Sequence, residues 1–202
     1  MSAVERDALA TAARHLAGRG LSPGSSGNLS MRSADRILVT PTGSSLARIT
    51  ADELAEVGTG SRGTARPSKE LPLHEAVYRA RPDARAIVHL HSPFATAASC
   101  LVPDADGNCP IPILTPYQGM RFPSIPVAPY AKPGSAALAE EVRRAAARSA
   151  ALLMANHGLI VAAPSLDAAI DLAEELESAM QVFFLLHGQE ARPLTAEQRA
   201  EL

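Results

Sequence analysis

Two histidines within an apolar run are the feature that most constrains the fold and the function of this chain. His89 and His91 lie in the segment Ile87-Val-His-Leu-His-Ser92. On an extended strand, residues i and i+2 point to the same face, so the two imidazoles would lie side by side. Two nitrogens on one face supply half of a tetrahedral metal site. Taken alone, the pair is explained equally well by packing in the core.

The composition indicates one globular domain over residues 1–202. Apolar residues make up 47% of the chain and aromatic residues 3%, and the net charge is −2. Scarce aromatics and the lack of a basic run argue against a nucleic-acid or membrane partner. The N-terminus lacks an apolar signal segment, and Cys100 and Cys109 do not form a CxxC pair. We therefore expect a soluble protein of the cytoplasm.

Patterns of helix and strand alternate along the chain. Apolar periodicity and capping residues predict helices at 4–18, 71–81, 93–101, 135–150, 165–186 and 195–202, with a capping-box turn at 50–53. Strands are predicted at 29–32, 37–40, 86–91, 113–115, 125–128, 151–155 and 159–163. Residues 58–63 form a predicted glycine-rich turn, and 103–112 a proline-rich irregular stretch. Because several strands follow one another through turns, we expect an α/β sandwich with a mixed, mostly antiparallel sheet.

A third histidine occupies a turn between two predicted strands. His157 lies in Asn156-His-Gly158, and functional groups concentrate at strand ends on a rigid sheet. Adding His157 to the pair shifts the interpretation from core packing toward a metal site. His15, His74 and His187 fall within predicted helices, where a solvated or partly packed side chain is the expectation.

Glu70 begins a predicted helix in Pro67-Ser-Lys-Glu70. The helix dipole favours a carboxylate there, which alone would explain the residue. Glu70 could also act as a fourth metal ligand or as an acid or base beside the metal. The neighbouring Lys69 is either a solvated lysine or a cation that grips a phosphate or carboxylate.

Three loop segments offer hydroxyls, amides or an ammonium to an anion: Ser25-Ser-Gly-Asn28, Thr40-Pro-Thr-Gly43 and Ser68-Lys69. Loop amides and helix N-termini bind anions, although none of these segments matches a P-loop and each alone could be an ordinary turn. Together they give the candidate phosphate- and substrate-binding residues: Ser25, Ser26, Asn28, Thr42, Gly43, Ser68 and Lys69.

Five ordered motifs resemble the class II aldolase/adducin family over residues 5–187. They are Ser26-Gly-Asn-Leu-Ser, Val39-Thr-Pro-Thr-Gly43, Pro67-Ser-Lys-Glu70, Val88-His-Leu-His-Ser92 and Asn156-His-Gly-Leu159. The resemblance implies a three-layer α/β/α fold and a homotetramer with active sites between subunits. It also implies Zn²⁺, or another divalent cation such as Mn²⁺ or Co²⁺, on His89, His91 and His157. Glu70 matches the catalytic carboxylate, which can also ligate the metal.

Departures from the fuculose-phosphate aldolase pattern favour a different branch. Lys69 stands where those aldolases have serine, and Pro129-Tyr-Ala-Lys-Pro-Gly134 lacks their aromatic residue. These segments, together with Leu114-Thr-Pro-Tyr117, are similar to 3-oxo-tetronate 4-phosphate decarboxylases. Epimerases of the family typically have Asp where Glu70 stands.

The resemblance thus implies a metal-dependent carbon–carbon lyase on a phosphorylated sugar acid. Decarboxylation of 3-oxo-tetronate 4-phosphate and cleavage of fuculose 1-phosphate leave the same enediolate of dihydroxyacetone phosphate. Glu70 would protonate it, and Lys69 and Tyr117 are further catalytic candidates. For Tyr117 and Tyr130, packing or interface contact is the alternative role. A fuculose-phosphate aldolase and a non-catalytic adducin-like interaction module remain alternative functions.

Overall fold

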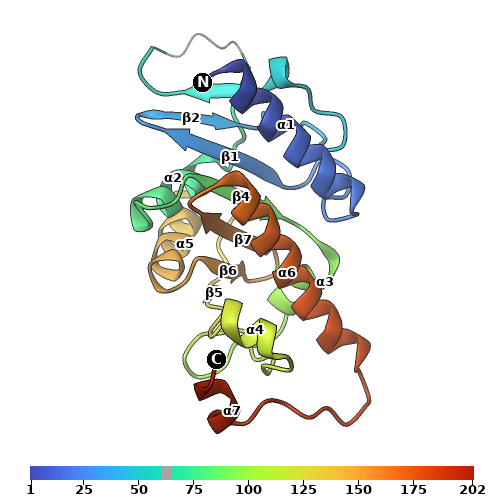
Figure 1. The fold of residues 1–202 in the computed structure, drawn as a ribbon. Coiled ribbons are helices and arrows are strands. Elements are labelled where there is room, and N and C mark those ends of the chain that lie inside the picture. Colours follow the sequence, from blue (N-terminus) through green and yellow to red (C-terminus); the bar gives the residue numbers. More distant parts are fainter. Residues whose placement is uncertain (61–64) are drawn as a thin grey trace.

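A single sheet runs through the protein. The computed structural model describes residues 1–60 and 65–202, and in that part seven strands hydrogen-bond in the order β3-β2-β1-β4-β7-β6-β5. Figure 1 shows the twisted sheet running through the molecule between its helices. The strands are β1 Asn28–Ser33, β2 Arg36–Val39, β3 Ala55–Val57, β4 Ala86–Leu90, β5 Val127–Ala128, β6 Ala151–Met154 and β7 Gly158–Ala163.

The pairing is antiparallel throughout, except that β5 runs parallel to β6 at one edge. The central strand β4 has every residue buried, as expected for a strand covered on both faces. Its neighbours set the register of the site, because Asn28 of β1 and Ile160 of β7 both lie opposite His89.

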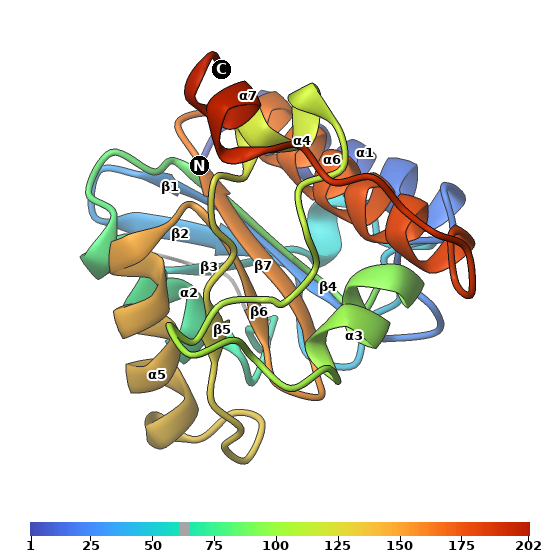
Figure 2. The same cartoon turned by 90° about the horizontal axis from the view of Figure 1, so that it is seen from below.

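Helices cover both faces of the sheet, as Figure 2 shows with α2 and α5 on one side and α1, α3 and α6 on the other. Their bounds are α1 Ala3–Gly18, α2 Leu71–Ala80, α3 Pro93–Ser99, α4 Pro116–Arg121, α5 Ala136–Arg148, α6 Leu166–Leu185 and α7 Ala196–Ala200, with a 3₁₀ turn at Ala51–Glu53. This arrangement confirms the predicted α/β/α sandwich. Among the described residues, no helix is long and apolar enough to cross a membrane.

Alternation along the strands produces two cores. Val88 and Leu90 of β4 join the core under α1, α3 and α6, whereas Ile87 faces α2 and α5. His89 shares the face of Ile87, because successive strand residues alternate between faces. The histidine is therefore carried at the end of an apolar layer, near the point where α2 begins.

Most predicted elements are present within a few residues of their expected bounds. The strand predicted at 113–115 is wrong. Leu114 donates its N–H to the Gln118 side chain, and the Ile113 carbonyl accepts from Leu194 of the returning C-terminal segment. Thr115 caps α4 instead. The strand predicted at 125–128 shortens to β5, and β3 and α4 were not predicted. Residues 61–63 of the predicted glycine-rich turn lie outside the described residues.

Candidate metal centre

His89 is held rigidly at the floor of the site. Its side chain is fully buried, and its Nδ1 lies 2.7 Å from the carbonyl oxygen of Leu159 on β7. A carbonyl only accepts, so Nδ1 carries the hydrogen and Nε2 keeps its lone pair. A backbone acceptor behind a histidine ligand fixes both ring orientation and tautomer.

The other two imidazoles meet His89 from separate segments. His91 follows the end of β4, and its Nε2 lies 3.1 Å from Nε2 of His89. His157 lies in the β6–β7 turn, where its backbone N–H donates to the hydroxyl of Ser99. The three ring centroids are 4.7 to 5.0 Å apart. The predicted triad is therefore brought together.

Glu70 completes the cluster from the N-cap of α2. Its Oε2 lies 3.4 Å from Nε2 of His89, and its Oε1 lies 3.4 Å from Nε2 of His157. The Asn28 side chain donates to Oε2 over 2.9 Å. The carboxylate is only 6% exposed, so these contacts replace most of its hydration.

The electrostatics favour a neutral His91 beside an ionised carboxylate. Burial raises the pKa of Glu70, but the interactions with His157, His89 and Asn28 outweigh it and hold that pKa below its usual range. Burial, followed by repulsion from His89 and His157, lowers the pKa of His91 to about 4. Deprotonated imidazole nitrogens and a carboxylate are the forms that bind a metal.

These four residues fit a divalent cation. One ligand atom from each of Glu70, His89, His91 and His157 lies within 4.8 Å of the others. Three imidazoles and one oxygen donor suit Zn²⁺ and related ions of the first transition row. The fixed tautomer of His89 leaves Nε2 available, which supports this assignment.

The cluster opens into a cavity of about 500 Å³. Its walls contain all the predicted phosphate- and substrate-binding residues: Ser25, Ser26, Asn28, Thr42, Gly43, Ser68 and Lys69. Sequence reasoning assigned no site role to the other wall residues: Gly27, Pro41, Ser44, Thr96, Pro133 and Asn156. Tyr130 also lines the cavity and is largely exposed. The Pro129-Tyr segment that the sequence singled out was the available signal for Tyr130.

Close packing brings the loop at residues 25–28 next to the histidine cluster. Gly27 has a φ of +75°, and a Cβ there would lie 2.9 Å from the carbonyl oxygen of His89. Glycine is needed because a side chain would collide with that backbone. In the described residues, the Gly27 and Gly43 N–H groups and the Ser25 and Thr42 hydroxyls have no hydrogen-bond partner. They are free donors at the cavity wall.

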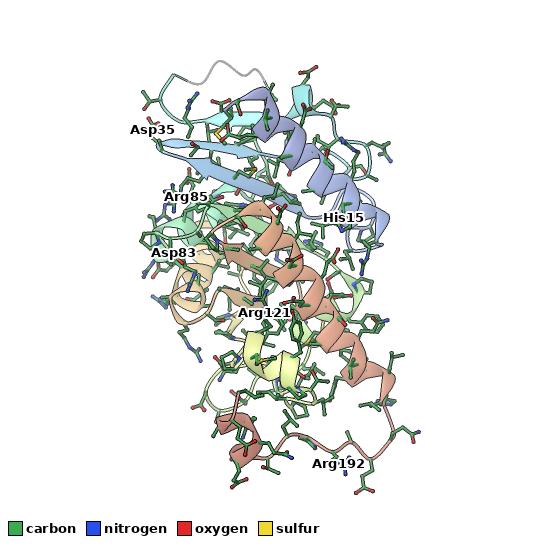
Figure 3. The ribbon with its side chains drawn as sticks, in the orientation of Figure 1. His15, Asp35, Asp83, Arg85, Arg121 and Arg192 are labelled. Atoms are coloured by element: carbon green, nitrogen blue, oxygen red, sulfur yellow. The ribbon has the colours of Figure 1, made fainter. Side chains whose placement is uncertain are left out.

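Lys69 and Tyr117, the further catalytic candidates, lie in different places. Lys69 is exposed at the cavity, and its ammonium makes no ion pair with the described residues. Tyr117 lies on α4, outside the cavity wall, and donates its hydroxyl to Glu175 of α6 over 2.7 Å. Figure 3 shows the neighbouring Arg121 beside α6, where it also donates to Glu175. Tyr117 is thus the one predicted site residue that this chain does not bring to the cluster.

The prediction for His74 is wrong. The residue is fully buried, and its ring lies between Asn28 and Ser30 of β1. The reason is the packing of α2 on the sheet, which turns the face bearing Glu70, His74 and Tyr78 toward β1. The i, i+4 spacing of these three residues was the available signal.

The chain matches the family described as Class II Aldolase and Adducin N-terminal domain over residues 7–184. It is 44% identical to a 3-oxo-tetronate 4-phosphate decarboxylase of Haemophilus influenzae over 91% of this chain and 89% of the relative. It is 37% identical to an L-fuculose phosphate aldolase of Escherichia coli over 81% and 75% of the two chains. The crystal structure of YgbL from Klebsiella pneumoniae superposes with a TM-score of 0.92 at 40% identity, covering 100% and 99%. The chain therefore belongs to the class II aldolase and adducin family.

Proposed function

We propose that this protein is a metal-dependent lyase that converts 3-oxo-tetronate 4-phosphate to dihydroxyacetone phosphate and CO₂. The observation that carries the proposal is the cluster of three imidazoles and Glu70 at the floor of a cavity with free anion-binding donors in its walls. Relatives at 41–44% identity are named for this reaction.

His89, His91 and His157, with Glu70, would hold the cation, which we propose to be Zn²⁺, with Mn²⁺ or Co²⁺ as substitutes. When bound, such an ion acts as a Lewis acid that stabilises negative charge developing on a substrate oxygen, an effect worth several kcal/mol. The protein's part is to keep the ligands in place, and the bond from His89 to Leu159 does so for one of them.

Glu70 is the proposed acid/base residue. Loss of CO₂ leaves an electron pair on the carbon that bore the carboxylate, and this carbon must gain a proton. Glu70 is the carboxylate in contact with the histidines. It can take up a proton through the open cavity and pass it from Oε1 or Oε2 to that carbon.

The substrate's two anionic ends match two parts of the cavity wall. The free donors of Ser25, Gly27, Thr42 and Gly43 suit a phosphate, since backbone amides and hydroxyls satisfy its oxygens. The ammonium of Lys69 then suits the carboxylate that leaves as CO₂. Holding both ends lets remote binding energy orient the reacting bond.

Two further expectations concern the protein as a whole. We propose a cytoplasmic homotetramer with active sites between subunits, as the family resemblance implies. The exposed apolar surface of α4 and of the end of α6, which includes Tyr117, Met120 and Leu185, supports burial against another copy. In such an assembly Tyr117 could contribute to the site of a neighbouring subunit.

A substrate panel tests the function. The metal-loaded protein should release CO₂ and dihydroxyacetone phosphate from 3-oxo-tetronate 4-phosphate, and a chelator should abolish the release. Glu70→Gln should lower turnover roughly 10²- to 10⁴-fold, whereas Glu75→Gln on the same helix should not. Cleavage of fuculose 1-phosphate without CO₂ release from the acid would indicate an aldolase instead. No turnover and less than one metal per chain would indicate an interaction module.

A further inference from the structure

A buried row of polar side chains lies behind Glu70, between β1 and α2. Tyr78 lies 2.9 Å from the Ser30 hydroxyl, and that hydroxyl lies 2.7 Å from Nδ1 of His74. Nε2 of His74 contacts Oδ1 of Asn28, whose Nδ2 donates to Glu70. The four residues behind Glu70 are at most 4% exposed, so water does not compete for these bonds.

The directions of these hydrogen bonds follow from the ionised state of Glu70. A carboxylate only accepts, so Asn28 must present its NH₂ to Glu70 and its carbonyl to His74. Nε2 of His74 therefore carries a hydrogen. Burial lowers the pKa of His74 to about 3, so the ring is neutral and Nδ1 accepts. Ser30 donates to Nδ1 and accepts from Tyr78.

His74 thereby locks the Asn28 amide. If the amide rotated by 180°, its NH₂ would face the N–H of His74, leaving two donors opposed and a buried carbonyl opposed to Glu70. Leaving buried polar groups unpaired is costly. The amide is thus restrained to aim a donor at the carboxylate.

We propose that His74, as a neutral Nε2–H imidazole, is a positioning residue that fixes Asn28 and through it the orientation of Glu70. The inference rests on the proposed function only for the role of Glu70 in turnover. The arrangement of hydrogen bonds stands independently of the substrate. Loss of a residue that hydrogen-bonds a metal ligand typically costs 10- to 100-fold in activity or metal affinity, and Asn28, which His74 holds, is such a residue for Glu70.

Two substitutions of His74 separate positioning from packing. In His74→Gln the side-chain NH₂ can replace the Nε2–H and donate to Asn28, whereas His74→Phe fills space without a donor. We expect His74→Phe to lower kcat roughly 10- to 100-fold with KM changed less than threefold or so, and His74→Gln to recover most of the loss. Both variants lack the Nδ1 atom to which the Ser30 hydroxyl bonds. General damage to packing would therefore lower the activity of both variants alike.

Two measurements need no substrate. Nitrogen-15 NMR of histidine-labelled protein should show His74 neutral with its proton on Nε2. Titration with Zn²⁺ against a competing chelator should show weaker binding for His74→Phe than for His74→Gln, because Glu70 belongs to the ligand set. Failure of the wild-type protein to decarboxylate would overturn the proposed function alone. A protonated His74, an Nδ1–H tautomer, or equal metal affinity in the two folded variants would overturn the positioning role.

Discussion

His89 donates from Nδ1 to the carbonyl oxygen of Leu159 on the adjacent strand, 2.7 Å away. The bond joins the two strands that carry the histidine cluster, because β4 leads into His91 and β7 begins just after His157. The backbone of β7 therefore sets which nitrogen of His89 faces the other ligands. A candidate metal ligand is held by the same sheet that forms the core.

Removing a single histidine of the cluster should release the metal. We expect His157→Ala to bind less than one cation per chain and to lose more than about 100-fold in turnover, beyond the usual loss for an outer hydrogen-bonding partner. Elemental analysis and the decarboxylation assay measure the two effects. His15→Ala is the control, since His15 on α1 (Figure 3) pairs with Glu174 of α6 and neither residue lines the cavity. Full metal content in His157→Ala would contradict the proposed ligand set.

Gly158 should tolerate no side chain. A Cβ there would lie 2.3 Å from the Leu90 carbonyl oxygen and 3.3 Å from the Cα of His91. We expect Gly158→Ala to lower the free energy of unfolding by more than about 1 kcal/mol, and to weaken metal binding by displacing His91. Chemical denaturation and metal titration check the two parts. Gly18→Ala is the matched control, because nothing lies within 4 Å of the added Cβ. A Gly158→Ala protein as stable as Gly18→Ala would contradict the steric argument.

The carboxylate of Glu177 should stabilise the fold at the start of α3, just after His91. From α6 it accepts the Ser92 hydroxyl at 2.6 Å and the backbone N–H groups of Phe94 and Ala95 at 2.8 and 2.7 Å. Glu177→Gln replaces one acceptor oxygen by a donor that faces donors. We expect a loss of about 1.5–3 kcal/mol in the free energy of unfolding, measured by chemical denaturation. Glu174→Gln on the same helix is the control, because Glu174 forms its ion pairs at the surface. This substitution should cost less than about 1 kcal/mol. Equal losses for the two variants would contradict the structural role of Glu177.

Local sequence signals predicted the parts of the fold that local chemistry determines. The capping box predicted at 50–53 forms, and Ser165 and Thr195, the first residues of two predicted helices, cap α6 and α7. The rings of His89 and His91 meet as expected, although β4 ends at Leu90 and His91 lies just beyond the strand. The strand predicted at 113–115 failed because its hydrogen-bonding groups are used by Gln118 and by Leu194, which is distant in sequence.

The residues of the site also divide into those that the sequence identified and those that depend on tertiary packing. His89, His91, His157 and Glu70 were recognisable from their segments and from the family motifs, and the structure brings their ligand atoms together. The i, i+4 spacing of Glu70, His74 and Tyr78 places them on one helix face, but the partners of His74 depend on the registration of α2 against β1. Only tertiary packing shows that Ser30 and Asn28 satisfy both nitrogens of that ring.

Buried His74 should make stability depend on pH. Burial, with a smaller effect from His89, lowers the pKa of His74 to about 3 in the folded protein, against about 6.5 in an unfolded chain. Between these values the unfolded chain binds the extra proton. The contribution of His74 to stability is therefore fully present above pH 6.5 and is lost as the pH falls toward 3, with a slope of up to about 1.4 kcal/mol per pH unit. Denaturation of the metal-free protein between pH 7 and 4 measures this slope. The slope should be shallower in His74→Gln, which has no imidazole to protonate at this position. Parallel pH curves for the two proteins would show that His74 does not titrate with a lowered pKa.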